Sequence, residues 1–114
     1  MAAKGASTYI VDVSIKSGKI TVSPDPVIVE GKNAKLKWKI TTPGWIFPEF
    51  EEGIELKCGS GGEFSNGHRS ETDPAEYTLH DKNAVKRQHL YVVSVMKEDG
   101  SFPMYLDPTI GNEG

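Results

Sequence analysis

The chain has little of what a disulfide-bonded, exported or membrane-spanning protein needs. Cys58 is the only cysteine in 114 residues, so no internal disulfide can form, as suits a reducing compartment. No apolar run approaches the roughly 18 residues that cross a bilayer. The first residues also lack the apolar stretch of an export signal. We therefore expect a soluble, cytoplasmic protein with no membrane partner.

Strong charge of one sign is also missing. The formal net charge is −3, so any attraction to nucleic acid would have to come from a local patch. The candidate patch is a lysine stripe on one predicted strand face, formed by Lys32, Lys35, Lys37 and Lys39. No exposed aromatic residues alternate with these lysines to stack on bases. We expect a solvated face that resists edge-to-edge aggregation, and no nucleic-acid partner.

A helical period is absent, and an alternating period of two takes its place. In residues 34–41, Leu36, Trp38 and Ile40 face one way, while the lysines between them face the other. Residues 9–16, 54–58 and 76–80 alternate in the same way. About seven or eight short strands at such spacing are typical of a sandwich. The sequence predicts an all-β, single-domain antiparallel two-sheet β-sandwich of Greek-key type over residues 8–110, with flexible tails at 1–7 and 111–114.

The last third of the chain predicts the centre and the edge of a sheet. Residues 90–96 are apolar at nearly every position and rich in valine, which is typical of a central strand. Asp99-Gly100 then indicates a tight hairpin. The returning strand, residues 102–110, contains Pro103 and Pro108, so we expect it to be bent or to lie at an edge.

Residues 20–40 contain a strand bent by Pro24 and Pro26, a turn at Gly31 and a strand that carries Trp38. This order resembles the opening hairpins of cupredoxin-like and immunoglobulin-like sandwiches. The closing hairpin, residues 91–110, looks like the final strands of small β-sandwich proteins of unknown function. The resemblance covers roughly 40 residues and implies the fold.

The copper site of the cupredoxin-like family is not implied. That family takes one histidine from a loop after the tryptophan-bearing strand, and a Cys, His and Met group from one late loop. Here the first histidine after Trp38 is His68, and Met96 and Met104 lie far from Cys58. We expect no cofactor.

Other catalytic or metal chemistry would have to use scattered residues. His68, His80 and His89 could gather with nearby carboxylates around a metal, but no pair has a recognised ligand spacing. Cys58 alternates with two inward apolar residues, which favours a small buried side chain over a nucleophile. A small enzyme or metal-binding protein that uses the three histidines therefore stands as the alternative function, and we expect no catalytic site.

The segment 43–53 is unusual because large apolar side chains fill a proline-bounded connection. These side chains either plug the end of the sandwich, which we favour, or anchor a partner, with acidic residues around them. The candidate binding residues are Trp45, Ile46, Phe47, Phe50, Glu51 and Glu52.

The next connection, residues 59–74, is rich in Gly, Ser, Asn and charge, and its length predicts a mobile or functional loop. We expect a non-catalytic binding module that uses both segments to contact another protein. A purely structural domain of a larger assembly is the second alternative.

Overall fold

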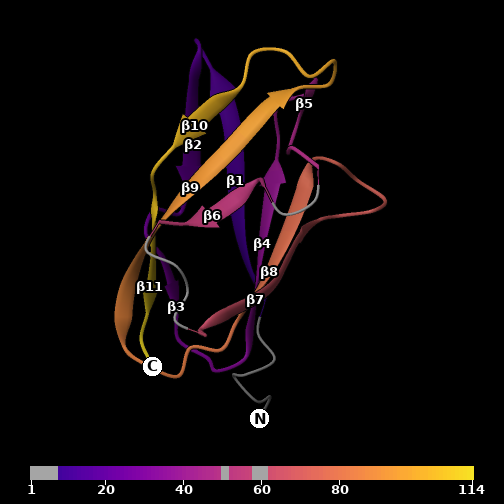
Figure 1. Ribbon diagram of the computed structural model, residues 1–114. Helices are drawn as coiled ribbons and strands as arrows, with labels where there is room; N and C mark the ends of the chain where they lie inside the picture. The colour runs from indigo at the N-terminus through magenta and orange to yellow at the C-terminus, as the bar shows by residue number, and fades with distance from the viewer. Residues whose placement is uncertain (1–7, 50–51, 58–61) are drawn as a thin grey trace.

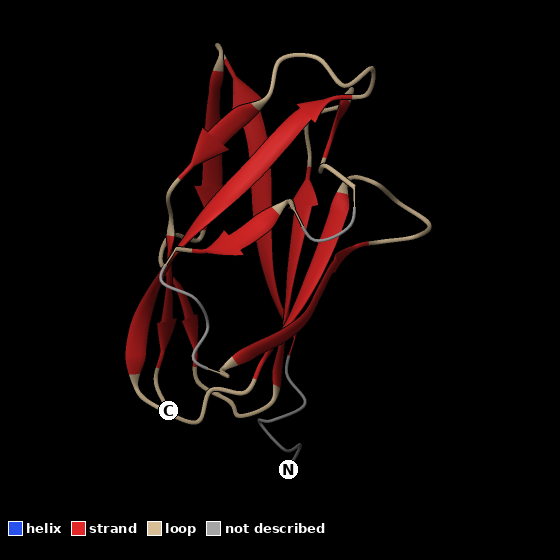
Figure 2. Cartoon of the chain, viewed as in Figure 1, coloured by secondary structure: helices blue, strands red, loops and turns tan. Residues whose placement is uncertain are grey.

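The computed structural model describes residues 8–49, 52–57 and 62–114. These residues form eleven strands and no helix, in two sheets that make up a sandwich (Figures 1 and 2). No helix among them could cross a membrane. The predicted all-β, two-sheet architecture is therefore confirmed.

The first sheet contains five strands, and three of them come from the first third of the chain. Its order is β2 (Lys19–Ser23), β1 (Thr8–Lys16), β4 (Ala34–Ile40), β8 (Glu76–Asp81) and β7 (Phe64–Arg69). The second sheet is built around one long strand, with the order β10 (Met104–Leu106), β9 (Arg87–Lys97), β11 (Thr109–Asn112) and β3 (Val27–Val29). Two more short strands, β5 (Trp45–Ile46) and β6 (Ile54–Leu56), also pair with β9.

The described residues differ from the prediction in strand number and direction. There are eleven strands rather than seven or eight, because several of them are short strands of only two to four residues. Both sheets are mixed rather than antiparallel, because β1 runs parallel to β4 and β3 runs parallel to β11. Alternation predicts which face of a strand is buried, but it carries no information on the direction of the neighbouring strand.

Strand β4 shows most clearly how the sequence pattern becomes a core. Ala34, Leu36 and Trp38 are fully buried, whereas Lys35 and Lys39, on the opposite face, are exposed. The third lysine of this face, Lys37, forms an ion pair with Glu76 of β8 at 3.1 Å. Three lysines of the stripe thus lie on the outer face of a central strand, and Lys32 lies in the turn before it.

Strand β9 is the centre of the second sheet, as predicted. Val93 pairs with Ile54 of β6 on one edge and with Leu106 of β10 on the other. The predicted last strand divides at Pro108 into β10 and β11, and both halves pair with β9. The carbonyl of Pro108 still accepts a hydrogen bond from the Tyr91 amide at 3.1 Å, so the chain stays alongside β9 between β10 and β11.

An aromatic cluster fills the centre of the sandwich. The ring of Trp38 meets Tyr77 and Tyr91 edge to face, with centroids 6.2 and 5.4 Å apart. The Trp38 indole N–H donates to the Tyr91 hydroxyl at 3.0 Å, so its polar atom is satisfied. Phe47 extends the cluster against Tyr77, with ring centroids 5.9 Å apart.

The ordered sandwich continues past the predicted domain end at residue 110. Strand β11 runs to Asn112, and both Gly111 and Asn112 are buried. The amide of Glu113 donates to the Val29 carbonyl at 2.9 Å. The other predicted tail, residues 1–7, lies outside the described residues.

Candidate functional site

A groove of about 430 Å³ opens between β6 of one sheet and β7 of the other. Figure 1 shows these two strands facing each other on one side of the sandwich. The groove is lined by Glu52, Ile54, Glu55, Leu56, Phe64, Ser65, Asn66, Gly67, Tyr77 and Leu79. Both segments singled out in the sequence therefore contribute to it, the first through Glu52 and the second through residues 64–67.

The floor of the groove is part of the hydrophobic core. Ile54 and Phe64 point inward from the two facing strands and are almost fully buried. Tyr77 and Leu79 form the base from β8, and Leu56 is half-buried against the same core. An apolar side chain entering the groove would meet core residues directly, which is the usual character of a binding pocket.

Gly67 allows β7 to lie close to the floor. A Cβ atom at this position would stand 2.7 Å from the Tyr77 hydroxyl oxygen and 3.0 Å from a Leu79 methyl carbon. The register between β7 and β8 also shifts between Ser65 and His68, as at a β-bulge. A larger residue at position 67 would require either β7 or the side chains of Tyr77 and Leu79 to shift, and either shift would change the shape of the groove.

The rim of the groove is acidic. Glu52 and Glu55 are both exposed, and neither forms an ion pair with another described residue. Among the described residues, no lysine, arginine or histidine lines the groove. The rim therefore favours a ligand that brings positive charge.

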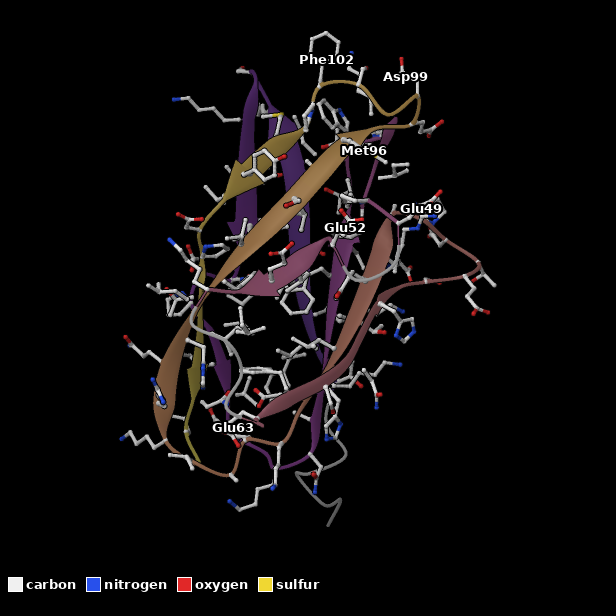
Figure 3. All side chains as sticks on the ribbon, in the orientation of Figure 1. Glu49, Glu52, Glu63, Met96, Asp99 and Phe102 are labelled. Carbon is white, nitrogen blue, oxygen red and sulfur yellow. The ribbon has the colours of Figure 1, made fainter. Side chains whose placement is uncertain are left out.

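The same two glutamates border a second hollow, of about 160 Å³, on the outer face of the second sheet. This hollow also contains Pro48, Met96 and Tyr105. Figure 3 places Glu52 below Met96, with Phe102 at the upper end of the molecule and Glu63 at the lower end. Glu52 and Glu55 thus form a ridge between two depressions.

The residues predicted to bind a partner are separated by the structure. Trp45 and Ile46 form β5 and are half-buried, whereas Phe47 is fully buried and plugs the core. Phe47 is thus covered and cannot serve as an exposed anchor in this conformation. Glu52 lies on the groove rim, and Phe50 and Glu51 lie outside the described residues.

Trp45 instead takes part in a contact at the upper end of the sandwich. The ammonium group of Lys97 lies 5.9 Å from the Trp45 ring centroid and 4.8 Å from that of Phe102. Phe102 is 66% exposed, so this lysine links one half-buried ring to one exposed ring. The contact is distant in sequence from the groove residues of β7.

The prediction of a long loop over residues 59–74 is wrong. Residues 64–69 form β7, which pairs with β8 at the edge of the first sheet. Its sequence, Phe-Ser-Asn-Gly-His-Arg, lacks the alternating pattern of a strand, because Phe64 is its only buried apolar side chain. Phe64, a single aromatic in a polar stretch, was the signal within β7 that could have located this side of the groove.

The three histidines do not come together. His68 is exposed and its Nδ1 lies 2.9 Å from the Asn66 carbonyl oxygen, while His80 is half-buried on the outer face of β8. His89 is buried on β9 and meets the Phe64 ring edge to face, with centroids 4.8 Å apart. No three His, Cys, Asp or Glu residues in the described ranges could hold a metal, and Cys58 falls outside those ranges.

A group of buried polar side chains lies at the lower end of the sandwich. One carboxylate oxygen of Asp81 accepts hydrogen bonds from the Asn83 backbone N–H and from Asn112 Nδ2, both at 2.9 Å. Asn83 Nδ2 donates to the carbonyls of Val29 and Gly31 at 3.1 and 3.0 Å. These bonds join β8, β11 and the turn after β3.

Several atoms of this polar group have no partner within the described structure, namely Asp81 Oδ2, His89 Nε2 and Asn112 Oδ1. Burial raises the pKa of Asp81 to about 6. Burial, helped by the charge of Arg87, lowers the pKa of His89. Burial also acts to raise the pKa of Glu63, but the amides of Ala84 and Val85 and the side chain of Asn112 donate to it and lower it overall.

Comparison with known proteins identifies no relative of this chain: no protein family matches it, and no curated protein matches its sequence.

Proposed function

We propose that this chain is a non-catalytic binding module that contacts another protein through the groove between β6 and β7. The observation that carries the proposal is the composition of this groove. Its floor consists of core side chains, its rim carries two carboxylates, and none of the described residues that line it is a histidine. A hollow with an apolar base and a few polar groups at its edge is typical of a binding site.

The strongly perturbed titratable groups lie elsewhere. Asp81 and Tyr91, whose pKa values burial raises most, do not line the groove. An enzyme that used general acid or base catalysis would instead place such a group inside its cleft. Glu63 and His89, whose pKa values are lowered, line a separate hollow of about 290 Å³, so the support for a binding role concerns the groove alone.

Two further points belong to the same proposal. We propose that the sandwich is of the cupredoxin-like and immunoglobulin-like kind, and the support is the bent strand, the turn and the buried Trp38 of residues 20–40. A cytoplasmic location is supported by the single cysteine, because this chain cannot form the internal disulfide bonds that are common in oxidising compartments.

The test is a selection for binding by short peptides. A displayed library of random heptapeptides is selected on the folded protein, and the retained peptides are titrated into the ¹⁵N-labelled chain. We expect the largest amide shift changes at residues 54–56 and 64–67, which line the groove.

A matched pair of variants separates groove binding from general surface binding. Leu56 and Leu106 are both half-buried leucines on short strands that pair with β9. Leu56→Trp should fill the groove and weaken peptide binding, whereas Leu106→Trp, which lies away from it, should leave binding unchanged. Thermal unfolding of each variant checks that it is folded. Failure to retain any peptide, or equal affinity for both variants, would overturn the proposal.

A further inference from the structure

The two carboxylates of the ridge, Glu52 and Glu55, have no ion-pair partner among the described residues. The nearest basic residue in sequence, Lys57, instead forms an ion pair with Asp107 at 3.2 Å. No lysine, arginine or histidine in the described ranges lines either the groove or the second hollow. Both carboxylates can therefore meet a basic group that a ligand brings.

Exposed carboxylates are ordinary surface groups, but these two separate two depressions with apolar walls. On one side, the groove has a volume of about 430 Å³ and a floor of core residues. On the other side, the second hollow of about 160 Å³ is lined by Met96, Pro103 and Tyr105, among others. A ligand that lies over the ridge thus meets apolar surface on both sides and negative charge between them.

Tyr105 forms an aromatic wall of the second hollow. It lies on β10 opposite Ser94 of β9, which lines the same hollow, and 66% of it is exposed. Exposed tyrosines beside a depression are frequent anchors of protein interfaces. The hollow is smaller than the roughly 300–1,000 Å³ of a small-molecule pocket, so it suits one side chain of a larger ligand.

We propose that the groove binds a polypeptide segment that crosses the ridge, with a lysine or arginine over Glu52 and Glu55 and one apolar side chain in each of the two depressions. A polypeptide is the ligand because it carries basic and apolar side chains at short spacing on one chain. An extended heptapeptide reaches about 25 Å, and the two shorter dimensions of the molecule are 26 and 22 Å. Such a segment can therefore reach from one depression to the other. This inference rests on the proposed function and specifies its ligand.

The first test uses the heptapeptides that are retained on the folded protein. We expect these peptides to carry a lysine or arginine with an apolar residue on each side of it. Their titration into the ¹⁵N-labelled chain should change the amide shifts of residues 94–96 and 105, in addition to those of residues 54–56 and 64–67. Changes confined to the groove would overturn the crossing of the ridge and leave groove binding intact.

The second test concerns the charge of the ridge. Glu52→Gln with Glu55→Gln should weaken binding of the basic peptides by about three- to tenfold, and high salt should remove the difference. The same double variant should change the affinity by less than about twofold for a peptide whose basic residue is replaced by glutamine, because the two charges then no longer meet.

The matched control for this change in charge is Glu30→Gln with Glu113→Gln. Both glutamates are exposed, and neither lines the groove or the second hollow. This control has the same net charge as the ridge variant and should bind like the wild type. An equal loss in both double variants would show that only the overall charge matters and would overturn the inference.

The third test concerns the second hollow. Tyr105→Ala should weaken peptide binding by about three- to tenfold, because it removes the aromatic wall. Phe102→Ala is the matched control, since Phe102 is also 66% exposed but does not line the hollow, and it should leave binding unchanged. Thermal unfolding of each variant checks that it is folded. Wild-type affinity of Tyr105→Ala would contradict the inference.

The outcomes separate this inference from the proposed function. Acidic or uncharged peptides that map to the groove overturn the inference and leave groove binding intact. Shift changes at both depressions that depend on protein concentration, together with a dimer in sedimentation, would assign the ridge to a second copy of the chain and also overturn it. Retention of no peptide overturns both proposals.

Discussion

The interior of the sandwich has an aromatic region, formed by Trp38, Phe47, Tyr77 and Tyr91, and a polar region. The polar region consists of Asp81, Asn83, His89 and Asn112, with Glu63 at its border. Both regions are buried, but they differ in whether their polar atoms have hydrogen-bond partners. The Trp38 N–H has the Tyr91 hydroxyl as its acceptor, whereas three atoms of the polar region have no partner within the described structure.

This difference separates two sources of stability. The aromatic region gains free energy from the apolar area that it removes from water. The polar region joins three parts of the chain by hydrogen bonds, but it also holds a carboxyl group where its charged form is disfavoured. We therefore expect mutations in the first region to act at every pH and mutations in the second to act in a pH-dependent way.

The largest effect is expected for Phe47→Ala. Phe47 is fully buried against Tyr77, so its removal leaves a cavity and should lower the free energy of unfolding by about 3–5 kcal/mol. Trp45→Ala is the neighbouring control, because Trp45 is only half-buried and should cost less than half as much. Urea denaturation measures both. Equal losses would show that the plug does not belong to the aromatic region.

The next effect is expected for Asp81→Asn and should depend on pH. The pKa of Asp81 rises from 3.8 to about 6 on folding, so its favourable contribution is complete below pH 3.8 and is lost as the pH rises through 6. The variant should therefore be more stable than the wild type at pH 8, by about 2–3 kcal/mol, and this gain should disappear near pH 4.

The comparison with the wild type isolates Asp81 from its neighbours. The lowered pKa values of Glu63 and His89 act in the opposite direction, since each gives stability that is lost as the pH falls. Both contributions are present in the variant and largely cancel in the difference. Urea denaturation at several pH values measures this difference, and a constant value between pH 4 and 8 would contradict the division into two regions.

The smallest effect is expected for Tyr91→Phe. The change removes the acceptor of the Trp38 N–H without removing the ring, so it should cost about 1–2 kcal/mol at every pH. Tyr105→Phe is the control, because Tyr105 is 66% exposed and should be neutral. A pH-dependent loss at Tyr91 below pH 8 would show that the aromatic region is coupled to the polar one.

Much of the fold could be predicted from the sequence, because burial on one face of a strand leaves a period of two in the chain. The pattern of residues 34–40 predicted the buried face of β4, and the valines of residues 90–96 predicted a central strand. Strand β7 could not be predicted in this way. Its outer residues are polar, and a single buried aromatic, Phe64, does not make a period.

The candidate site was predicted only in part. The sequence indicated the segments 43–53 and 59–74, and both reach the groove. It could not show that Phe47 turns inward while Glu52 stays on the rim, because both lie in a connection without regular alternation. Nor could it place Leu79 and Tyr77 beneath Gly67, since that contact depends on how close two strands approach.

The sequence by itself determined that this protein is a β-sandwich and which faces of its main strands are buried, because alternation is a local property of each segment. The tertiary structure decided which strands became neighbours, which edges remained open and which polar side chains met in the interior. Those outcomes depend on pairing between residues far apart in the chain, and no local pattern encodes that pairing.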